Sequence, residues 1–366
     1  MKKSIRKTTG RKIEVDWNAQ LVIGIDLGDR ISQYVVLDDA GERVADGRLP
    51  TSAEAFEKRF GTMASKVIAI ETGTHSPWVC RLLRRLGHRV TVANSRKLRL
   101  IYENRMKNDK VDAEYLARLV RVDPALLSPV EHRNEGAQHD VALLRSRDVL
   151  VKTRSRLISH VRGAVKSVGL RIPQCSVEAF VRRARPIVPA ELSVALGGIL
   201  STIEQLDAQI AAFDRQVERL AKESYPDAEV LRQIPGVGAL TAVAYMATVG
   251  DPARFAHSRT VGAWVGLVPG QFASGQSDPQ QRITREGDTY LRSLLINCAH
   301  YILGPFGPDC DLRRHGEAIA ARGGKNAKKR AVVAVARKLA VLLHRLWCTR
   351  AVYEPLWNAR QAAAAA

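Results

Sequence analysis

The stretch that decides the fold of the N-terminal part of this chain is Leu21-Val-Ile-Gly-Ile-Asp-Leu-Gly28. It is apolar apart from one carboxylate, Asp26, and it ends in glycine, a pattern that predicts a buried strand carrying an acid to the edge of a sheet. A second apolar run, Lys66-Val-Ile-Ala-Ile70, leads in the same way to Glu71 and then to Thr72-Gly73. The sequence therefore predicts two strands that each end in a carboxylate.

A helical segment farther along, residues 107–120, adds two acids, Asp109 and Asp112, which are three residues apart and share one helical face. If this helix packs across the sheet at the strand tips, the four carboxylates meet. Such a cluster raises the pKa of its members unless a cation neutralises it. We expect two Mg2+ ions there, or Mn2+ in their place, because these hard cations take carboxylate oxygen. Two ions about 4 Å apart activate a water or hydroxyl and stabilise the leaving oxygen in phosphodiester cleavage.

Residues 19–130 are expected to form an α/β domain with an RNase H-like sheet. A hairpin comes first and strands then alternate with helices, which is the order of such a layered fold. The expected strands are 21–28, 33–37, 43–48, 66–71 and 89–93, and the expected helices are 52–60, 77–86 and 107–120. Gly-Ile-Asp-Leu-Gly also begins the actin-like ATPases and sugar kinases. Those proteins need a second phosphate-binding turn and a glycine-rich adenosine motif, and the sequence contains neither.

The middle of the chain, residues 131–224, is expected to be helical. A basic helix covers about 135–172, and a second helix runs from about Glu191 to Lys222. The second helix has apolar residues at alternating steps of three and four, the spacing of a coiled-coil seam: Leu196, Ile199, Ile203, Leu206, Ile210, Phe213, Val217 and Leu220. The two helices predict an antiparallel or oligomerising stalk, although a buried helix of a monomeric bundle would show the same spacing.

The C-terminal part, residues 225–350 followed by a tail over 351–366, begins with a helix-hairpin-helix signature, Leu231-Arg-Gln-Ile-Pro-Gly-Val-Gly-Ala-Leu-Thr-Ala242. Its glycines, Gly236 and Gly238, would let backbone N–H groups at the start of the next helix approach a phosphate of DNA. An ordinary Pro-Gly helix junction would contain the same residues. Further helices are expected over 258–267 and 290–303.

A glycine-rich loop follows, Gly266-Leu-Val-Pro-Gly-Gln-Phe-Ala-Ser-Gly-Gln-Ser277, with Arg282 and Arg285 after it. A serine in such a loop can act as a nucleophile on phosphorus, because guanidinium groups stabilise the charge that develops. A loop serine considered alone more often serves only a turn.

The charge of the chain points to a polyanionic partner. The sequence has 57 Lys and Arg against 37 Asp and Glu, a net charge of +20, and nucleic acid is the simplest partner for such an excess. Residues 321–350 contain nine Lys or Arg and no acid, and residues 141–172 contain eight with one acid. We expect phosphate contacts from Arg145, Arg154, Arg282, Arg285, Lys328, Lys329 and Arg330.

The five cysteines lack Cys-x-x-Cys spacing, which fits a reducing cytosol. Residues 1–18 predict a flexible basic arm without the apolar core of a signal peptide, and no apolar run reaches the roughly 18 residues of a membrane span. We therefore expect a cytoplasmic, nucleoid-associated protein without a membrane partner.

Together these motifs resemble the DEDD-type insertion-sequence transposases, the family that includes the pilin-gene invertases and the bridge-RNA-guided recombinases. The resemblance rests on these stretches: Gly24-Ile-Asp-Leu-Gly28, Ile70-Glu-Thr-Gly73, Lys107-Asn-Asp-Lys-Val-Asp-Ala113, Ile234-Pro-Gly-Val-Gly238, Gly266-Leu-Val-Pro269, Ser274-Gly275 and Gly287-Asp-Thr-Tyr-Leu-Arg292. It implies a RuvC-like nuclease domain that binds Mg2+ through Asp26, Glu71, Asp109 and Asp112. It also implies a C-terminal transposase domain whose serine forms a covalent phosphoserine link to DNA.

By position in the motif that serine is Ser274. In the family the serine usually precedes two glycines and a Lys-rich step before the next glycine. Here Gln276 replaces the second glycine, and Arg285-Glu286 stands before Gly287. Ser277 therefore stays open as an alternative nucleophile.

We expect a site-specific recombinase that moves an insertion sequence, acts on double-stranded DNA and uses an element-encoded guide RNA. The acids and the serine are about 160 residues apart across the stalk. We therefore expect a homo-oligomer, dimer or tetramer, in which the acids of one subunit and the serine of another form a composite site. Two other classes stay open: a junction endonuclease without serine chemistry, which would form no protein–DNA adduct, and a non-catalytic nucleic-acid scaffold, which would show no metal-dependent cleavage.

Overall fold

The structure is a computed structural model that describes residues 20–98, 109–272, 274, 277, 279 and 281–364. The chain forms two compact units, residues 1–132 and 133–366, which are described separately below. The basic arm predicted over 1–18 and the predicted helix residues 107–108 lie outside the described residues. The helical segment and the C-terminal domain, expected as separate regions, both fall within the second unit.

The first unit is built on a five-stranded mixed sheet in the order β3-β2-β1-β4-β5. The strands are β1 (Val22–Asp26), β2 (Ile31–Leu37), β3 (Arg43–Pro50), β4 (Val67–Glu71) and β5 (Arg89–Ala93). β1, β2 and β3 are antiparallel neighbours, whereas β4 and β5 run parallel to β1. All five predicted strands are present, because alternating apolar runs separated by glycine turns identify strands well.

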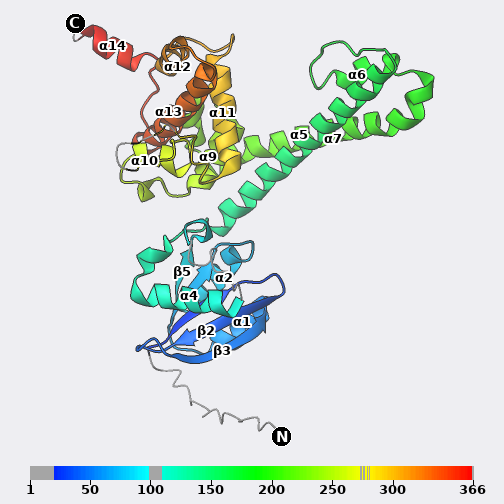
Figure 1. Ribbon diagram of the computed structural model, residues 1–366. Helices are drawn as coiled ribbons and strands as arrows, with labels where there is room; N and C mark the ends of the chain where they lie inside the picture. The colour runs from blue at the N-terminus through cyan, green and yellow to red at the C-terminus, as the bar shows by residue number, and fades with distance from the viewer. Residues whose placement is uncertain are drawn as a thin grey trace. The chain divides into compact units, whose positions relative to one another are not determined.

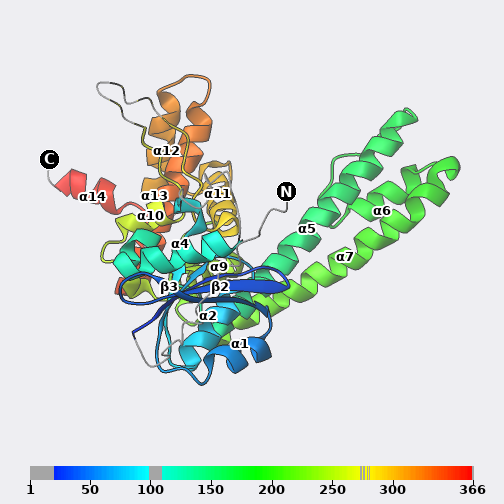
Figure 2. The ribbon, with the colours of Figure 1, turned by 60° about the horizontal axis from the view of Figure 1, so that its bottom comes forward.

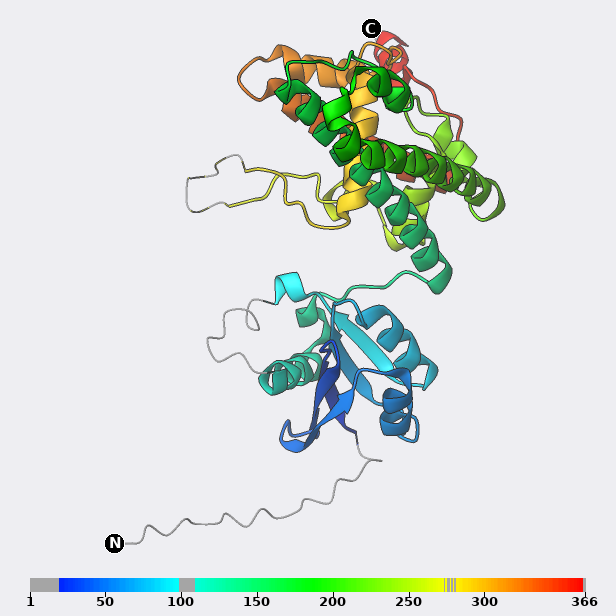
Figure 3. The same cartoon turned by 90° about the vertical axis from the view of Figure 1, so that its right-hand side faces the viewer.

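Helices cover both faces of this sheet, as Figure 3 shows. α1 (Ala53–Phe60) and α2 (Ser76–Arg85) lie on one face, where Phe56, Phe60 and Leu83 are fully buried against the isoleucines of β1 and β4. α4 (Asp109–Val122) lies on the other face. Short 3-10 turns at Ser95–Lys97 and Pro124–Leu127 complete the unit. The prediction of an α/β layered domain is confirmed at this level.

The second unit contains a long helix pair, α5 (Glu135–Ser167) and α7 (Ala190–Glu223), which lie side by side in Figures 1 and 2. Arg147 pairs with Asp214 and Arg154 with Asp207, so the two helices are antiparallel, as one of the predicted alternatives required. α6 (Phe180–Ala184) and a 3-10 turn at Arg185–Ile187 lie between them in the chain.

The predicted seven-residue repeat of α7 divides into two rows of different burial. Leu196, Ile203, Ile210 and Val217 are buried, whereas the alternate row, Ile199, Leu206, Phe213 and Leu220, is only half-buried. The buried row packs within the chain, and Ile199 and Leu220 of the half-buried row also pack against its core clusters. Coiled-coil pairing with another subunit stays a prediction.

The remaining helices pack into one large core around α9 (Ala239–Val249), of which all residues but Leu240 are buried. The Tyr245 hydroxyl donates to the Ala340 carbonyl oxygen at 2.7 Å, which ties α9 to the longest helix of this group. The group comprises α8 (Ala228–Arg232), α10 (Arg259–Trp264), α11 (Thr289–Leu303), α12 (Asp311–Ala321), α13 (Ala327–Thr349) and a 3-10 turn at Pro252–Arg254. A last helix, α14 (Trp357–Ala364), follows outside this core and contacts α12 through the Asn358 N–H, which donates to Asp311. Within the described residues, no helix is both long and apolar enough to span a bilayer.

Candidate catalytic sites

The sheet register brings the first two predicted acids together. Ile25 of β1 pairs with Ile70 of the parallel strand β4, so Asp26 and Glu71 are the next residues on adjacent strands. Side chains alternate between the faces of a strand. Because the isoleucines at 25 and 70 lie in the core beneath α1 and α2, Asp26 and Glu71 belong to the opposite face, which α4 covers.

The direction of α4 brings its acidic first turn toward the same place. Val22, at the start of β1, packs in one cluster with Leu116 and Val120. Two residues later, a Cβ on Gly24 would lie 2.0 Å from the carbonyl oxygen of Ala113, so only glycine allows the helix to pack so closely here. β1 and α4 therefore run in opposite directions. The first turn of the helix, with Asp109 and Asp112, therefore lies toward Asp26.

The four carboxylates differ in burial. Asp112 is 3 % exposed, Asp26 and Glu71 are partly buried, and Asp109 is exposed. All four are oxygen donors suited to a hard divalent cation. As the side chains stand, the described residues contain no group of three or more His, Cys, Asp or Glu placed to hold a metal ion. The backbone thus directs these donors to one face of the sheet.

The turn after Asp26 is fixed by its own residues. A Cβ on Gly28 would lie 2.2 Å from the Ile31 carbonyl oxygen, and the Thr51 hydroxyl donates to the Gly28 carbonyl oxygen at 2.9 Å. Both glycines of Gly-Ile-Asp-Leu-Gly therefore serve packing, Gly24 against α4 and Gly28 within a tight turn.

Sequence reasoning missed His75, which stands beside the acid-bearing strand ends. Its Nδ1 accepts from Trp78 Nε1 at 3.1 Å, and its Nε2 lies 3.5 Å from Asp29 Oδ1. This pair links the segment after β4 to the turn after β1. A histidine four residues after Glu71 was the signal available in the sequence.

The glycine-rich serine loop is a hairpin that extends from the helical core, and its described part is seen in Figure 3. The Thr284 N–H donates to the Val268 carbonyl oxygen, and the Gly270 N–H donates to that of Arg282, both at 2.9 Å. Farther out, Ser274 and Ser277 pair with each other through two backbone hydrogen bonds of 3.0 Å. Both serines are exposed. The two candidate nucleophiles are thus opposite one another on the same hairpin.

The base of this hairpin is held by Arg292, a buried residue of α11 that is 7 % exposed. Its guanidinium donates to the Val265 carbonyl oxygen at 3.0 Å and to that of Glu286 at 2.9 Å. Gly266 and Gly287 both have positive φ, and each approaches the backbone of the opposite strand of the hairpin base so closely that a Cβ would lie 2.1 Å from a carbonyl oxygen. The base is therefore rigid.

Asp288 completes the base by capping α11. It accepts from the Leu291 N–H at 3.0 Å and forms ion pairs with Arg133 at 2.9 Å and Arg145 at 2.7 Å. Burial alone would raise the pKa of Asp288, but the Leu291 N–H and the two arginines together hold it below its usual value. Burial lowers the pKa of Arg133 more than Asp288 raises it, but a guanidinium group stays protonated at neutral pH.

The predicted phosphate-binding arginines lie in different settings. The backbone of Arg282 is hydrogen-bonded to Gly270 and that of Arg285 to Gly266. Both arginines therefore lie nearer the base of the hairpin than the serines do. Arg145 is engaged by Asp288 but half-exposed, whereas the side chain of Arg154 is 12 % exposed and paired with Asp207. A further group is exposed at the start of α13, although Arg330 also donates to the Gly323 carbonyl oxygen at 3.2 Å: Lys328, Lys329 and Arg330.

The helix-hairpin-helix signature falls on α8, a turn and α9. Gly236 has a φ of +87° and lies against the ring of Tyr301, so a side chain there is excluded twice. Gly238 precedes the first residue of α9, and both glycines are exposed. Two helices thus flank the glycine turn, while a contact with DNA phosphate stays a prediction.

Comparison with known proteins gives two family matches and several relatives. A model of DEDD-type IS110 transposases matches residues 23–169, and a model of the IS116/IS110/IS902 transposase family matches residues 228–308. A Pseudomonas aeruginosa protein named "Probable family 20 transposase" is 29 % identical over 91 % of this chain and 98 % of its own length. The transposase for insertion sequence element IS1111A of Coxiella burnetii is 27 % identical over 91 % of each chain. The transposase for IS1328 of Yersinia enterocolitica is 28 % identical over 76 % of this chain and 82 % of its own.

The first family match covers the sheet, the helix α4 with its two acids and the basic helix α5. The second covers the glycine turn before α9 and the serine hairpin. The first two relatives, both named as transposases, are matched over more than nine-tenths of their own length. None of their names favours a junction endonuclease. The chain belongs to the DEDD-type family of insertion-sequence transposases and is a DNA transposase.

Proposed function

We propose that this transposase is a site-specific recombinase that uses two kinds of chemistry, a metal-bound carboxylate site and a serine nucleophile. The observation that carries the first is the register of β1 and β4, which makes Asp26 and Glu71 neighbours on the face that α4 covers. The strand order, with a hairpin followed by two parallel strands, supports an RNase H-like, RuvC-like assignment for this unit.

The ligands of the metal site would be Asp26, Glu71, Asp109 and Asp112. When bound, two Mg2+ ions, or Mn2+ in their place, would polarise the scissile phosphate and lower the pKa of a bound water or hydroxyl. The four carboxylates would hold and orient the metal ions, and the side chain of Asp112 is shielded from solvent.

Titration calorimetry of the full chain with Mg2+ tests this site independently of DNA cleavage. Asp26→Asn and Glu71→Gln should each weaken Mg2+ binding at least tenfold, because each removes a charged oxygen donor. Asp29→Asn is the matched control, because its side chain is 94 % exposed and lies just beyond the strand. Equal Mg2+ binding by all four proteins would exclude these ligands.

The serine step would be a transesterification. The hydroxyl oxygen of Ser274, or of Ser277, attacks phosphorus, a phosphoserine bond forms, and the bond from phosphorus to a sugar oxygen breaks. The serine proton ends on that sugar oxygen, and a hydroxyl of another strand later reverses the step. The pairing of the two serines on one exposed hairpin supports access to DNA for either of them.

Acids and serine would come from different subunits of a homo-oligomer. The acids belong to the first compact unit and the serines to the second, and the half-buried apolar row of α7 offers a surface for self-association. A mixture of Asp26→Ala and Ser274→Ala proteins should then recover part of the recombination that each lacks alone. Absence of recovery at every mixing ratio would contradict a composite site.

The DNA partners would be the element ends and the target, with an element-encoded guide RNA choosing both. Exposed cations at the start of α13 and the glycine turn before α9 support sequence-independent phosphate contacts. Charge reversal of Lys328, Lys329 and Arg330 should weaken binding to all DNA sequences alike and reduce its salt dependence. Unchanged binding in a salt titration would remove these residues from the DNA interface.

A further inference from the structure

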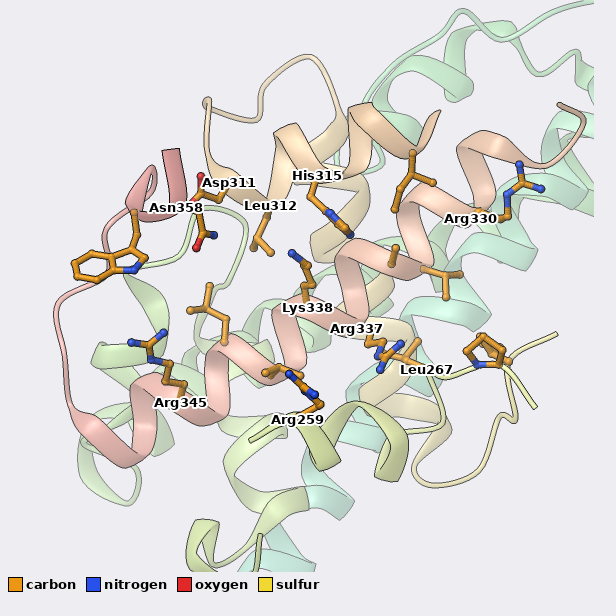
Figure 4. A pocket seen from close by; sticks show the side chains of 18 of the residues that line it. Arg259, Leu267, Asp311, Leu312, His315, Arg330, Arg337, Lys338, Arg345 and Asn358 are labelled. Carbon is orange, nitrogen blue, oxygen red and sulfur yellow. The ribbon is translucent and has the colours of Figure 1, made fainter. Parts of the chain in front are cut away.

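A large recess in the second unit is separate in its residues from the carboxylates and the serines. It has a volume of about 1740 Å3 and is bounded by α10, the base of the serine hairpin, α12, α13 and residues 351–358. Figure 4 shows α13 crossing it, with His315 of α12 and Arg259 of α10 on its two sides. A recess of this size exceeds the usual small-molecule site.

The recess is strongly positive. Nine Lys or Arg side chains and two carboxylates, Asp311 and Glu354, line the recess. The carboxylates are engaged elsewhere, since Asp311 accepts from the Asn358 N–H and Glu354 pairs with Arg360. Within the described part of the chain, none of the nine cations forms an ion pair. Their charge is therefore available to an anion.

The cations form a row along α13. Arg330, Arg337 and Arg345 are seven and eight residues apart, so they share one face at intervals of about 10–12 Å. The stem of Arg337 packs on Gly262, where a Cβ would lie 3.0 Å from the Cγ of Arg337. Burial, and then the charges of Lys338 and Arg322, lower the pKa of His315, so the ring is neutral at pH 7. A row of spaced charges suits a chain of phosphates.

Apolar side chains line the recess together with the cations. Val333, Val341 and Leu342 of α13 line it, and Trp357, 43 % exposed, stands at the end formed by the C-terminal segment. A duplex presents phosphates but hides the faces of its bases, whereas a single strand offers both phosphates and unstacked bases. Cations together with apolar side chains and an exposed tryptophan match the second kind of ligand.

We propose that this recess binds a single-stranded segment of nucleic acid, with phosphates on the α13 row and a base stacked on Trp357. This goes beyond the strand-transfer chemistry proposed above, because it needs neither the carboxylates nor the serines. The shared chemistry of DNA and RNA strands suffices, and the experiment distinguishes them.

The test measures fluorescence anisotropy of the full chain with labelled oligothymidylate, oligouridylate and a closed hairpin duplex. Trp357→Ala should weaken binding of a single strand about tenfold and leave duplex binding unchanged, since one base–aromatic stack is lost. Trp357→Phe should retain most of the affinity, which separates stacking from any loosening of α14.

Lys338→Gln/Arg345→Gln, both at exposed positions, should lower the slope of log affinity against log salt for single strands by about 1.4, because each phosphate contact contributes about 0.7. The matched control is Arg215→Gln/Arg219→Gln on α7, also exposed, which should leave that slope unchanged. Tighter binding of oligouridylate would assign the recess to RNA, and tighter binding of oligothymidylate to DNA. Loss of duplex and single-strand binding in equal measure, or no effect of Trp357→Ala, would overturn the proposal.

Discussion

The carboxylate edge, meaning the strand ends at Asp26 and Glu71, and the serine hairpin are both candidate catalytic parts. The fold holds them in opposite ways. Asp26 and Glu71 end two adjacent strands in the middle of a sheet that helices cover on both faces. Ser274 and Ser277 are exposed and lie farther out on a hairpin whose base is held by the buried side chain of Arg292. The acids thus occupy positions set by the sheet, while the serines lie outside the helical core on an exposed hairpin.

This difference fits the roles of the two parts. A metal site needs several donors within a narrow tolerance, so its ligands belong on strands and a packed helix. A nucleophile that must reach DNA can lie on an extended hairpin whose base is fixed to the core. Substitutions that loosen the carboxylate edge should therefore destabilise the first unit. Substitutions at the base of the hairpin should destabilise only the hairpin.

The largest effect is expected from Gly24→Ala. Its Cβ would meet the Ala113 carbonyl oxygen at 2.0 Å, so α4 must move off the sheet, and protection of β1 and β4 in hydrogen exchange should fall by more than about 3 kcal/mol. Gly73→Ala is the control, because a Cβ there meets nothing within 4 Å. Equal protection in both variants would mean that α4 does not lock the edge.

Arg292→Leu should release the base of the hairpin. It leaves the buried carbonyl oxygen of Val265 and the part-buried one of Glu286 without this donor, at a cost of about 3 kcal/mol. Proteolysis of residues 266–288 should accelerate while β1 and β4 keep their protection. Arg282→Gln, at an exposed position of the same hairpin, should change neither. Faster exchange in the sheet would show that the two parts are not independent.

Asp288→Asn should cost about 2 kcal/mol of local stability at pH 7, because two charge-assisted contacts with Arg133 and Arg145 weaken. The pKa of Asp288 is lowered in the folded chain, so its contribution is complete above the unfolded value of about 3.9 and disappears as pH falls through the folded value. The difference from wild type should be constant down to about pH 4.5 and shrink below it. A difference that grows on acidification would reverse the assigned sign.

The smallest effect is expected from Thr51→Val, which removes the donor to the Gly28 carbonyl oxygen while keeping the side-chain shape. The turn after Asp26 should lose about 1 kcal/mol in hydrogen exchange, and β4 should be unaffected. A loss as large as that of Gly24→Ala would make the turn, rather than α4, the main support of the edge.

Sequence predicted the sheet well because β1, β2, β4 and β5 are short, largely apolar runs, and β5 begins and ends at the predicted residues. The acids of strands β1 and β4 followed from the same pattern. The polar strand β3 was expected from the turn that precedes it. The approach of α4 to Gly24 could not be predicted, because it depends on a contact between residues 89 positions apart.

The serine hairpin shows where sequence reasoning ends. Two serines three residues apart are equivalent in spacing, and the structure pairs them across the hairpin instead of separating them. The arginines expected beside the serine lie nearer the hairpin base, because the backbone pairing with Gly266 and Gly270 determines their position. The half-burial of alternate apolar residues in α7 likewise depends on its partner helix, and the repeat alone did not reveal it.

The most direct test of two-part catalysis is a denaturing gel of the full chain incubated with cognate DNA, cognate RNA and Mg2+. We predict a covalent protein–DNA adduct in wild type that is lost in Asp26→Ala and lost in one, and only one, of Ser274→Ala and Ser277→Ala. DNA cleavage that proceeds without an adduct and survives both serine substitutions would contradict the account and leave a metal-dependent nuclease.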